Sequence, residues 1–123
     1  MKFRTLQWLS VALILGIGVI HLSMVPGEYQ EAQYMGILFA INFLAAIIAA
    51  IGILRQEVWG WALGVLIAAG SLIGYILSRT VGLPGMEIEA WLQPLGLLSL
   101  AAEVLFFILV IIIKPWAGLE RAK

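Results

Sequence analysis

Four long apolar stretches separated by short polar segments dominate the pattern of this chain. They lie at about Thr5–Leu22, Gln33–Leu54, Val58–Leu77 and Leu92–Ile113. Each has about 18–22 residues, and an α-helix of that length, rising about 1.5 Å per residue, crosses a hydrocarbon core of about 30 Å. Polarity does not alternate along them as it would in the strands of a barrel, and lipid offers no partner to unpaired backbone groups. The pattern therefore predicts an all-α fold, a four-helix transmembrane bundle.

The four stretches take up most of the 123 residues, so we expect a single four-span integral membrane domain over residues 1–123. The first stretch follows the charged segment Met1-Lys2-Phe3-Arg4, as the apolar part of a secretory signal does. It is long for such a signal, however, and no A-x-A cleavage pattern follows it. We expect it to be retained as a helix.

Positively charged residues gather on one side of this arrangement. Of the seven Lys and Arg, only Arg79 lies on the other side. Because Lys and Arg are enriched in cytoplasmic segments, we expect both termini in the cytoplasm. The six residues on the cytoplasmic side are Lys2, Arg4, Arg55, Lys114, Arg121 and Lys123.

Composition narrows the class of protein. Hydrophobic residues make up 63% of the chain and charged residues 11%, against about 25% charged residues in a typical soluble domain. A soluble fold would lack the polar residues to cover its surface. The net charge is zero, and there is no basic patch of the kind that nucleic acid requires.

No residue pattern typical of an enzyme is present. Cysteine is absent and His21 is the single histidine, which excludes thiolate and histidine-rich metal centres within one chain. A Ser-His-Asp set and a glycine-rich nucleotide loop are also missing. We therefore expect no enzymatic activity, no cofactor and no metal site. Four glutamates of the outer segments could weakly hold a divalent cation, but solvated charge is favoured; they are Glu28, Glu31, Glu87 and Glu89.

A short motif occurs twice. Pro26-Gly27-x-x-x-Glu31-Ala32 returns as Pro84-Gly85-x-x-x-Glu89-Ala90, with poor identity elsewhere. One interpretation is a pair of helical hairpins related by a pseudo-twofold axis along the membrane normal. The other, which is favoured, is one turn used twice, since Pro-Gly suits the exit from a helix.

Small residues at four-residue spacing predict how the helices meet, because they let backbones approach closely in lipid. The third stretch carries Gly60-x-x-x-Gly64-x-x-x-Ala68 and, on another face, Gly70-x-x-x-Gly74. Small residues on two faces indicate neighbours on both, so we expect the third span at the centre of the bundle. Packing within the chain is favoured over a homodimer face. Besides the lipid bilayer, a second copy or a larger membrane complex remains open as a partner.

Polar side chains inside the apolar stretches are the candidates for chemistry, because ionisable groups within a membrane are costly and mark function by default. Glu103 lies near the middle of the fourth stretch, one turn after Ser99 on the same face. Asn42 lies at a similar depth in the second stretch. We expect a ligand or proton track that descends from the outer surface to Asn42 and Glu103. Its members are His21, Asn42, Ser71, Tyr75, Arg79, Ser99 and Glu103.

Each of these residues also has a structural interpretation. His21 is favoured as an interfacial histidine, and Asn42 as a hydrogen bond between helices. Arg79 is favoured as a side chain that reaches the headgroups or pairs with a nearby glutamate. For Glu103, a protonated packing residue and a proton- or ligand-binding group are equally expected, and we expect its side chain to face Asn42 and Ser71.

Three features carry a resemblance to a known group of proteins. They are His21-x-x-x-x-Pro26, the stretch Tyr75-x-x-Ser78-Arg79-Thr80-x-Gly82-Leu83-Pro84, and Glu103 in the last span. In these features the chain resembles small four-span bacterial membrane proteins that are labelled only as hypothetical or uncharacterised. The resemblance covers most of the chain and implies a four-helix bundle in a bacterial inner membrane. It implies no activity.

Two functions from different classes follow. The favoured one is a non-enzymatic membrane module, an accessory subunit that packs on a larger complex or on itself. The alternative is a minimal transporter or a protein that handles protons or a small ligand along the polar track.

The distribution of Lys and Arg yields a test of topology. We expect single cysteines introduced by Gln30→Cys and Met86→Cys to react with an impermeant thiol reagent added to intact cells, because both positions lie in outer segments. The control is Gln56→Cys, in the short inner segment Arg55-Gln56-Glu57, which we expect to stay unlabelled. Labelling of this control from outside would overturn the orientation.

Overall fold

The structure, a computed structural model, describes residues 2–117. It contains four α-helices in the order α1 (Phe3–Glu31), α2 (Gln33–Leu54), α3 (Val58–Arg79) and α4 (Pro94–Ile113). Each is long and apolar enough to cross a membrane. The prediction of an all-α, four-helix bundle is confirmed.

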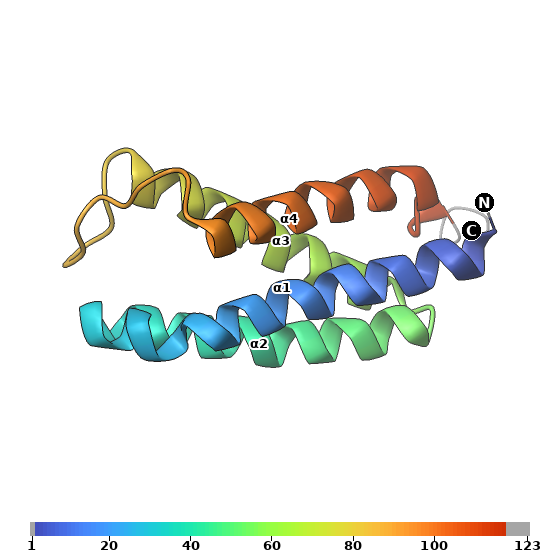
Figure 1. Cartoon of the computed structure of the whole chain (residues 1–123). Coiled ribbons are helices and arrows are strands. Elements are labelled where there is room, and N and C mark those ends of the chain that lie inside the picture. Colours follow the sequence, from blue (N-terminus) through green and yellow to red (C-terminus); the bar gives the residue numbers. More distant parts are fainter. Residues whose placement is uncertain (1, 118–123) are drawn as a thin grey trace.

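The helices run antiparallel along the chain, so the connections alternate between the two ends of the bundle (Figure 1). The start of α1, the α2–α3 connection and the end of α4 share one end, which we call the terminal end. The opposite end, called the distal end, carries the α1–α2 connection and the loop of residues 80–93 between α3 and α4. The helices form a ring in chain order, and α2 and α4 do not touch within the described residues. The α1–α2 pair and the α3–α4 pair diverge toward the distal end.

The sequence pattern predicts an outer loop over residues 23–32, between the first two apolar stretches, and this prediction is wrong. α1 stays helical to Glu31, through Pro26, and only the extended residue Ala32 separates it from α2. A proline inside a helix removes one backbone hydrogen bond, but here the last turns of α1 are supported by α2. A Cβ atom at Gly36 would lie 2.7 Å from the Tyr29 Cα, so the two backbones are almost in contact there. Tertiary packing overrides the local preference of proline for a helix end.

The repeated Pro-Gly motif does not repeat in structure. Pro26 and Gly27 lie inside α1, whereas Pro84 and Gly85 lie in the α3–α4 loop, where Gly85 has a φ of 74°. This left-handed conformation favours glycine. The expectation of one turn used twice is therefore wrong.

Each helix buries a narrow stripe and leaves large apolar side chains exposed around it. The buried residues of α4 recur at alternating steps of three and four residues, the spacing typical of helices that pack side by side in a bundle. In this setting the exposed apolar side chains are suited to contact with lipid. The buried stripe of α4 consists of Gly96, Ser99, Glu103, Phe106 and Val110.

The buried side chains differ between the two halves of the bundle. The half toward the terminal end holds the apolar core, in which Ile14, Ile17, Ile53 and Phe106 are fully buried. This half also buries the polar side chains of Gln7 and Ser10. From its middle to the distal end, the bundle buries a larger set of polar side chains. These are His21, Glu28, Ser78, Arg79, Ser99 and Glu103.

The prediction that the third span is central is wrong. α1 contacts all three other helices, and its pairing with α2 is the most extensive in the bundle. Gly18 permits this close pairing, because a Cβ atom there would lie 2.7 Å from the Cβ of Ala46. α3 also contacts all three other helices, but less extensively, so the most extensive packing belongs to the longest helix rather than to the one richest in glycine.

Only one of the two glycine stripes of α3 meets a neighbour within the chain. A Cβ atom at Gly60 would lie 2.6 Å from the Cα of Gly52, and one at Gly64 would lie 2.5 Å from the Phe106 ring. Gly70 and Gly74 have nothing within 4 Å of the same position. The first stripe sets the approach of α3 to α2 and α4, and the second is open.

These contacts make Gly60→Ala destabilising. The added methyl group would overlap backbone atoms of Gly52, which cannot turn aside as a side chain can, so we expect a loss of about 1–3 kcal/mol in unfolding free energy. The measurement is reversible unfolding in mixed detergent micelles. Gly70→Ala is the matched control on the same helix and should leave stability nearly unchanged, because its methyl group meets open space. Equal stability of the two variants would contradict the close contact between α2 and α3.

Candidate functional site

Arg79 ends α3 and holds the distal loop against the helix ends. Its side chain is only 5% exposed, and its guanidinium pairs through Nη1 with the Glu89 carboxylate at 3.1 Å. Nη1 also donates to Ser78 Oγ at 2.6 Å, Nε to the Ala90 carbonyl at 3.1 Å and Nη2 to Gln93 Oε1 at 3.0 Å. Of the structural alternatives for Arg79, the structure shows the ion pair with a nearby glutamate.

Tyr75 completes this network one turn earlier on α3. Its ring centroid lies 3.8 Å from the Arg79 guanidinium carbon, which is the distance of a cation–π contact. Its hydroxyl donates to the Trp91 carbonyl at 2.5 Å. Gly96 of α4 leaves the necessary room, since a Cβ atom there would lie 2.9 Å from Arg79 Nη2 and 3.0 Å from the Tyr75 ring. The Arg79 guanidinium, the Tyr75 ring and the α3–α4 loop thus hold one another in place.

Glu103 and Ser99 form a separate polar pair in the middle of α4. Glu103 is 2% exposed, and Ser99 Oγ donates to its Oε2 at 2.5 Å. The other carboxyl oxygen, Oε1, is buried without a hydrogen-bond partner among the described residues. The Glu103 side chain therefore lies in the bundle interior, where only one of its two carboxyl oxygens has a hydrogen-bond partner.

Asn42 and Ser71 form a third polar group, between α2 and α3. Asn42 Nδ2 donates to Ser71 Oγ at 3.0 Å, the hydrogen bond between helices that the sequence favoured. Asn42 Oδ1 is buried without a partner among the described residues. The expected hydrogen bonds from these two residues to Glu103 are not formed. Asn42 lies on α2, which does not touch α4, and Ser71 on α3 bonds to Asn42 instead.

His21 lies apart from the other candidates. It is buried between α1 and α2, where its ring centroid lies 4.7 Å from that of Phe39. Nδ1 lies 2.8 Å from the Ile17 carbonyl. A carbonyl only accepts, so Nδ1 donates there. No hydrogen bond joins His21 to Arg79 within the described residues. The seven expected track residues therefore fall into four groups rather than into one continuous hydrogen-bonded chain.

Two glutamines that the sequence pattern did not single out have structural roles. Gln7 Nε2 donates to the carbonyls of Ile53 and Leu54 at 2.8 and 3.3 Å, which satisfies backbone groups at the end of α2. Gln93 accepts from Arg79. A signal for Gln7 was present, because this polar residue stands one heptad before Ile14 on the buried stripe of α1.

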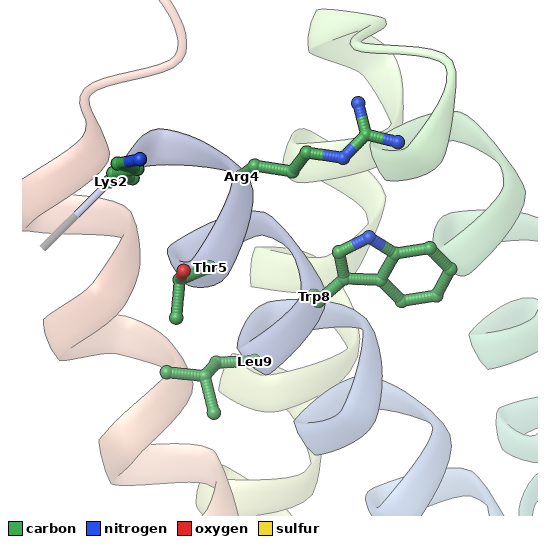
Figure 2. A pocket seen from close by; sticks show the side chains of 5 residues that line it. All are labelled: Lys2, Arg4, Thr5, Trp8 and Leu9. Atoms are coloured by element: carbon green, nitrogen blue, oxygen red, sulfur yellow. The ribbon is translucent and has the colours of Figure 1, made fainter.

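Two hollows lie at opposite ends of the molecule. The first, of about 550 Å³, is formed by Lys2 and the first turns of α1. Figure 2 shows Arg4 and Trp8 extending to the same side of this helix. Cationic and aromatic side chains at a helix end are typical anchors at a membrane surface, and no acidic group or histidine joins them. Its lining residues are Lys2, Arg4, Thr5, Trp8 and Leu9.

The second hollow, of about 390 Å³, lies at the distal end. It is lined by polar and backbone groups of the α3–α4 loop together with Glu31, and it opens beside the Arg79 network. The polar groups of the distal end therefore border an accessible space, whereas Glu103 and Asn42 have buried oxygens.

Comparison of the chain with known protein families, curated proteins and solved structures finds no match. The fold and its polar groups therefore define the class of protein. It is a multi-pass membrane protein with four helices that are long and apolar enough to span the bilayer.

The Arg79 network makes Arg79→Lys destabilising. Lysine keeps the charge but loses the planar fork that reaches Ala90 and Gln93 at once. We expect a loss of about 1.5–3 kcal/mol, the worth of a hydrogen bond to a charged group, and faster proteolysis within the loop of residues 80–93. Thermal unfolding in mild detergent and limited proteolysis measure the two effects. The exposed Arg55 is the control, and Arg55→Lys should change neither; equal behaviour of both variants would contradict this role of Arg79.

Proposed function

We propose that this protein is a non-enzymatic module of a bacterial inner membrane, an accessory subunit that packs on a larger membrane complex or on a second copy of itself. The resemblance carried by the Ser78-Arg79-Thr80-x-Gly82-Leu83-Pro84 stretch supports the bacterial inner membrane. The distribution of Lys and Arg supports a cytoplasmic terminal end and an outer distal end.

One observation carries this proposal: the terminal half of the bundle has a mainly apolar core, and its buried polar side chains, Gln7 and Ser10, donate to backbone carbonyls. Ile14, Ile17, Ile53 and Phe106 are fully buried there, and Trp61 is 3% exposed. A path for an ion or a polar solute needs polar groups or water along its length, because an unpaired polar group is costly in an apolar environment. The polar groups of the distal half end at Glu103, and the core beyond it is suited to holding helices together.

The open glycine stripe of α3 supports assembly with another membrane helix. Gly70 and Gly74 meet nothing within 4 Å, and Leu66 and Ile73 beside them are 68% and 57% exposed. Small residues at this spacing let a neighbouring helix approach closely in lipid. Within the chain this face is unused, so it is available to a partner.

A second function, proton or small-ligand handling, is favoured by Glu103 and Asn42. Each has one buried oxygen without a hydrogen-bond partner among the described residues. Such oxygens can accept a proton or a donor from a ligand. In this alternative, a second copy or another subunit would have to complete the path past Phe106.

Reconstitution into liposomes separates the two functions. We expect purified wild type to give no proton flux above empty liposomes, measured with an internal pH-sensitive dye under a proton gradient. Glu103→Gln should behave identically and keep the fold, because the amide preserves the shape of the side chain and can still accept from Ser99. Proton flux in wild type that Glu103→Gln abolishes, with unchanged helix content, would overturn the module and establish the alternative.

Photo-crosslinking tests the assembly itself. A photoreactive residue at Ile73, beside the open glycines, should give a discrete adduct in native membranes, either with a second copy or with one membrane protein. The matched control is Leu105, an exposed apolar residue on α4, which should give only lipid adducts. The same lipid-only result at both positions would contradict the assembly.

A further inference from the structure

Three carboxylates from separate parts of the chain meet at the distal end. Glu28 and Glu31 lie one turn apart at the end of α1, and Glu89 lies in the α3–α4 loop. One carboxylate oxygen from each lies within 4.8 Å of the others. Carboxylates repel one another, so this convergence favours either a bound proton or a compensating cation.

Glu28 shows that the compensation is incomplete within the chain. Its residue is only 8% exposed, and its carboxylate has no hydrogen bond and no ion pair among the described residues. An ionised carboxylate that is largely removed from water and has no partner is destabilising. Its oxygen is nevertheless directed toward those of Glu31 and Glu89. A buried, unpartnered acid therefore faces two others.

Arg79 does not satisfy this group. Its guanidinium binds Glu89 and uses its other donors on Ser78, Ala90 and Gln93. One guanidinium beside three carboxylates leaves two negative charges in excess, which is the charge that one divalent cation neutralises.

The spacing of the oxygens fits a cation of a particular size. Ca²⁺ binds oxygen ligands at about 2.4 Å, so two ligands on opposite sides of the ion are about 4.8 Å apart, and other pairs are closer. Zn²⁺ is bound mainly by Cys and His in proteins, and the cluster holds neither. Ca²⁺ also completes its shell with carbonyl oxygens and water, and the neighbouring hollow of about 390 Å³, which Glu31 and Glu89 line, has room for both.

We propose that Glu28, Glu31 and Glu89 form a binding site for a hard divalent cation of the size of Ca²⁺. The ion joins the end of α1 to the α3–α4 loop, at the end where the two helix pairs diverge. Local sequence favoured solvated charge because it placed Glu28 in a loop; the longer α1 buries this side chain instead. This site does not depend on the proposed function of the module.

The test is calcium titration of the purified, chelator-treated protein in non-ionic detergent. We expect wild type to bind Ca²⁺ with a dissociation constant of roughly 10⁻⁴–10⁻³ M, as weak sites do, and to unfold at a higher temperature when Ca²⁺ is present. Glu28→Gln should weaken binding about tenfold or more, because it removes one of three charged ligands. Without Ca²⁺ the same variant should unfold at a higher temperature than wild type, because it removes a repulsive buried charge.

Two further variants keep the test decisive. Glu31→Gln changes an exposed side chain, so it should weaken Ca²⁺ binding without disturbing the fold. Glu57→Gln changes an exposed glutamate at the terminal end, away from the cluster, and it should bind Ca²⁺ as wild type does. Absence of binding by wild type at millimolar Ca²⁺, or unchanged binding in both Glu28→Gln and Glu31→Gln, would overturn the site.

Discussion

The buried guanidinium of Arg79 is the constraint on which the distal half of the structure depends. A guanidinium within an apolar bundle must find acceptors, and those acceptors come from the loop that follows α3. Satisfying Arg79 therefore folds residues 80–93 back onto the helix ends and sets where α4 begins. The same requirement explains Gly96, since a side chain at that position would occupy the space of the guanidinium and of the Tyr75 ring. Arg79 thus helps to fix the loop and the position of Glu89, together with the hydrogen bonds from the Tyr34 hydroxyl to the Pro84 carbonyl and from the Glu89 N–H to the Ser78 carbonyl.

The bundle thus combines two kinds of packing along its length. Toward the terminal end, fully buried apolar side chains and glycine contacts hold the four helices together. Toward the distal end, the helix pairs diverge and polar groups occupy the interior. The difference between the two halves underlies both proposals, the membrane module and the cation site. The apolar half supports a module that does not conduct, and the polar half places three carboxylates where a cation could join α1 to the loop.

The arrangement of the helices also explains why Asn42 and Glu103 form no hydrogen bond with each other. A hydrogen bond requires contact, and the ring order of the helices keeps α2 and α4 apart. Asn42 and Glu103 therefore each bond to a serine, Asn42 across to α3 and Glu103 within α4. Each retains one unpaired oxygen. Similar depth in the membrane did not bring the two residues together.

The sequence by itself determined the number of helices and their approximate limits, because a chain in lipid must satisfy every backbone group within its own helices. It also indicated part of the buried polar set, namely His21, Arg79, Ser99 and Glu103. α2 begins and ends where the apolar pattern does. Only the tertiary structure decided the length of α1 and which helix packs most extensively against the others. It also decided the partners of Arg79, Asn42 and Glu103. Hydropathy records how a residue partitions between water and lipid, whereas these features depend on which helix lies beside which. Pro26 signals a helix end locally, yet contact with α2 along the last turns keeps α1 helical and turns Glu28 from a solvated loop residue into a buried acid.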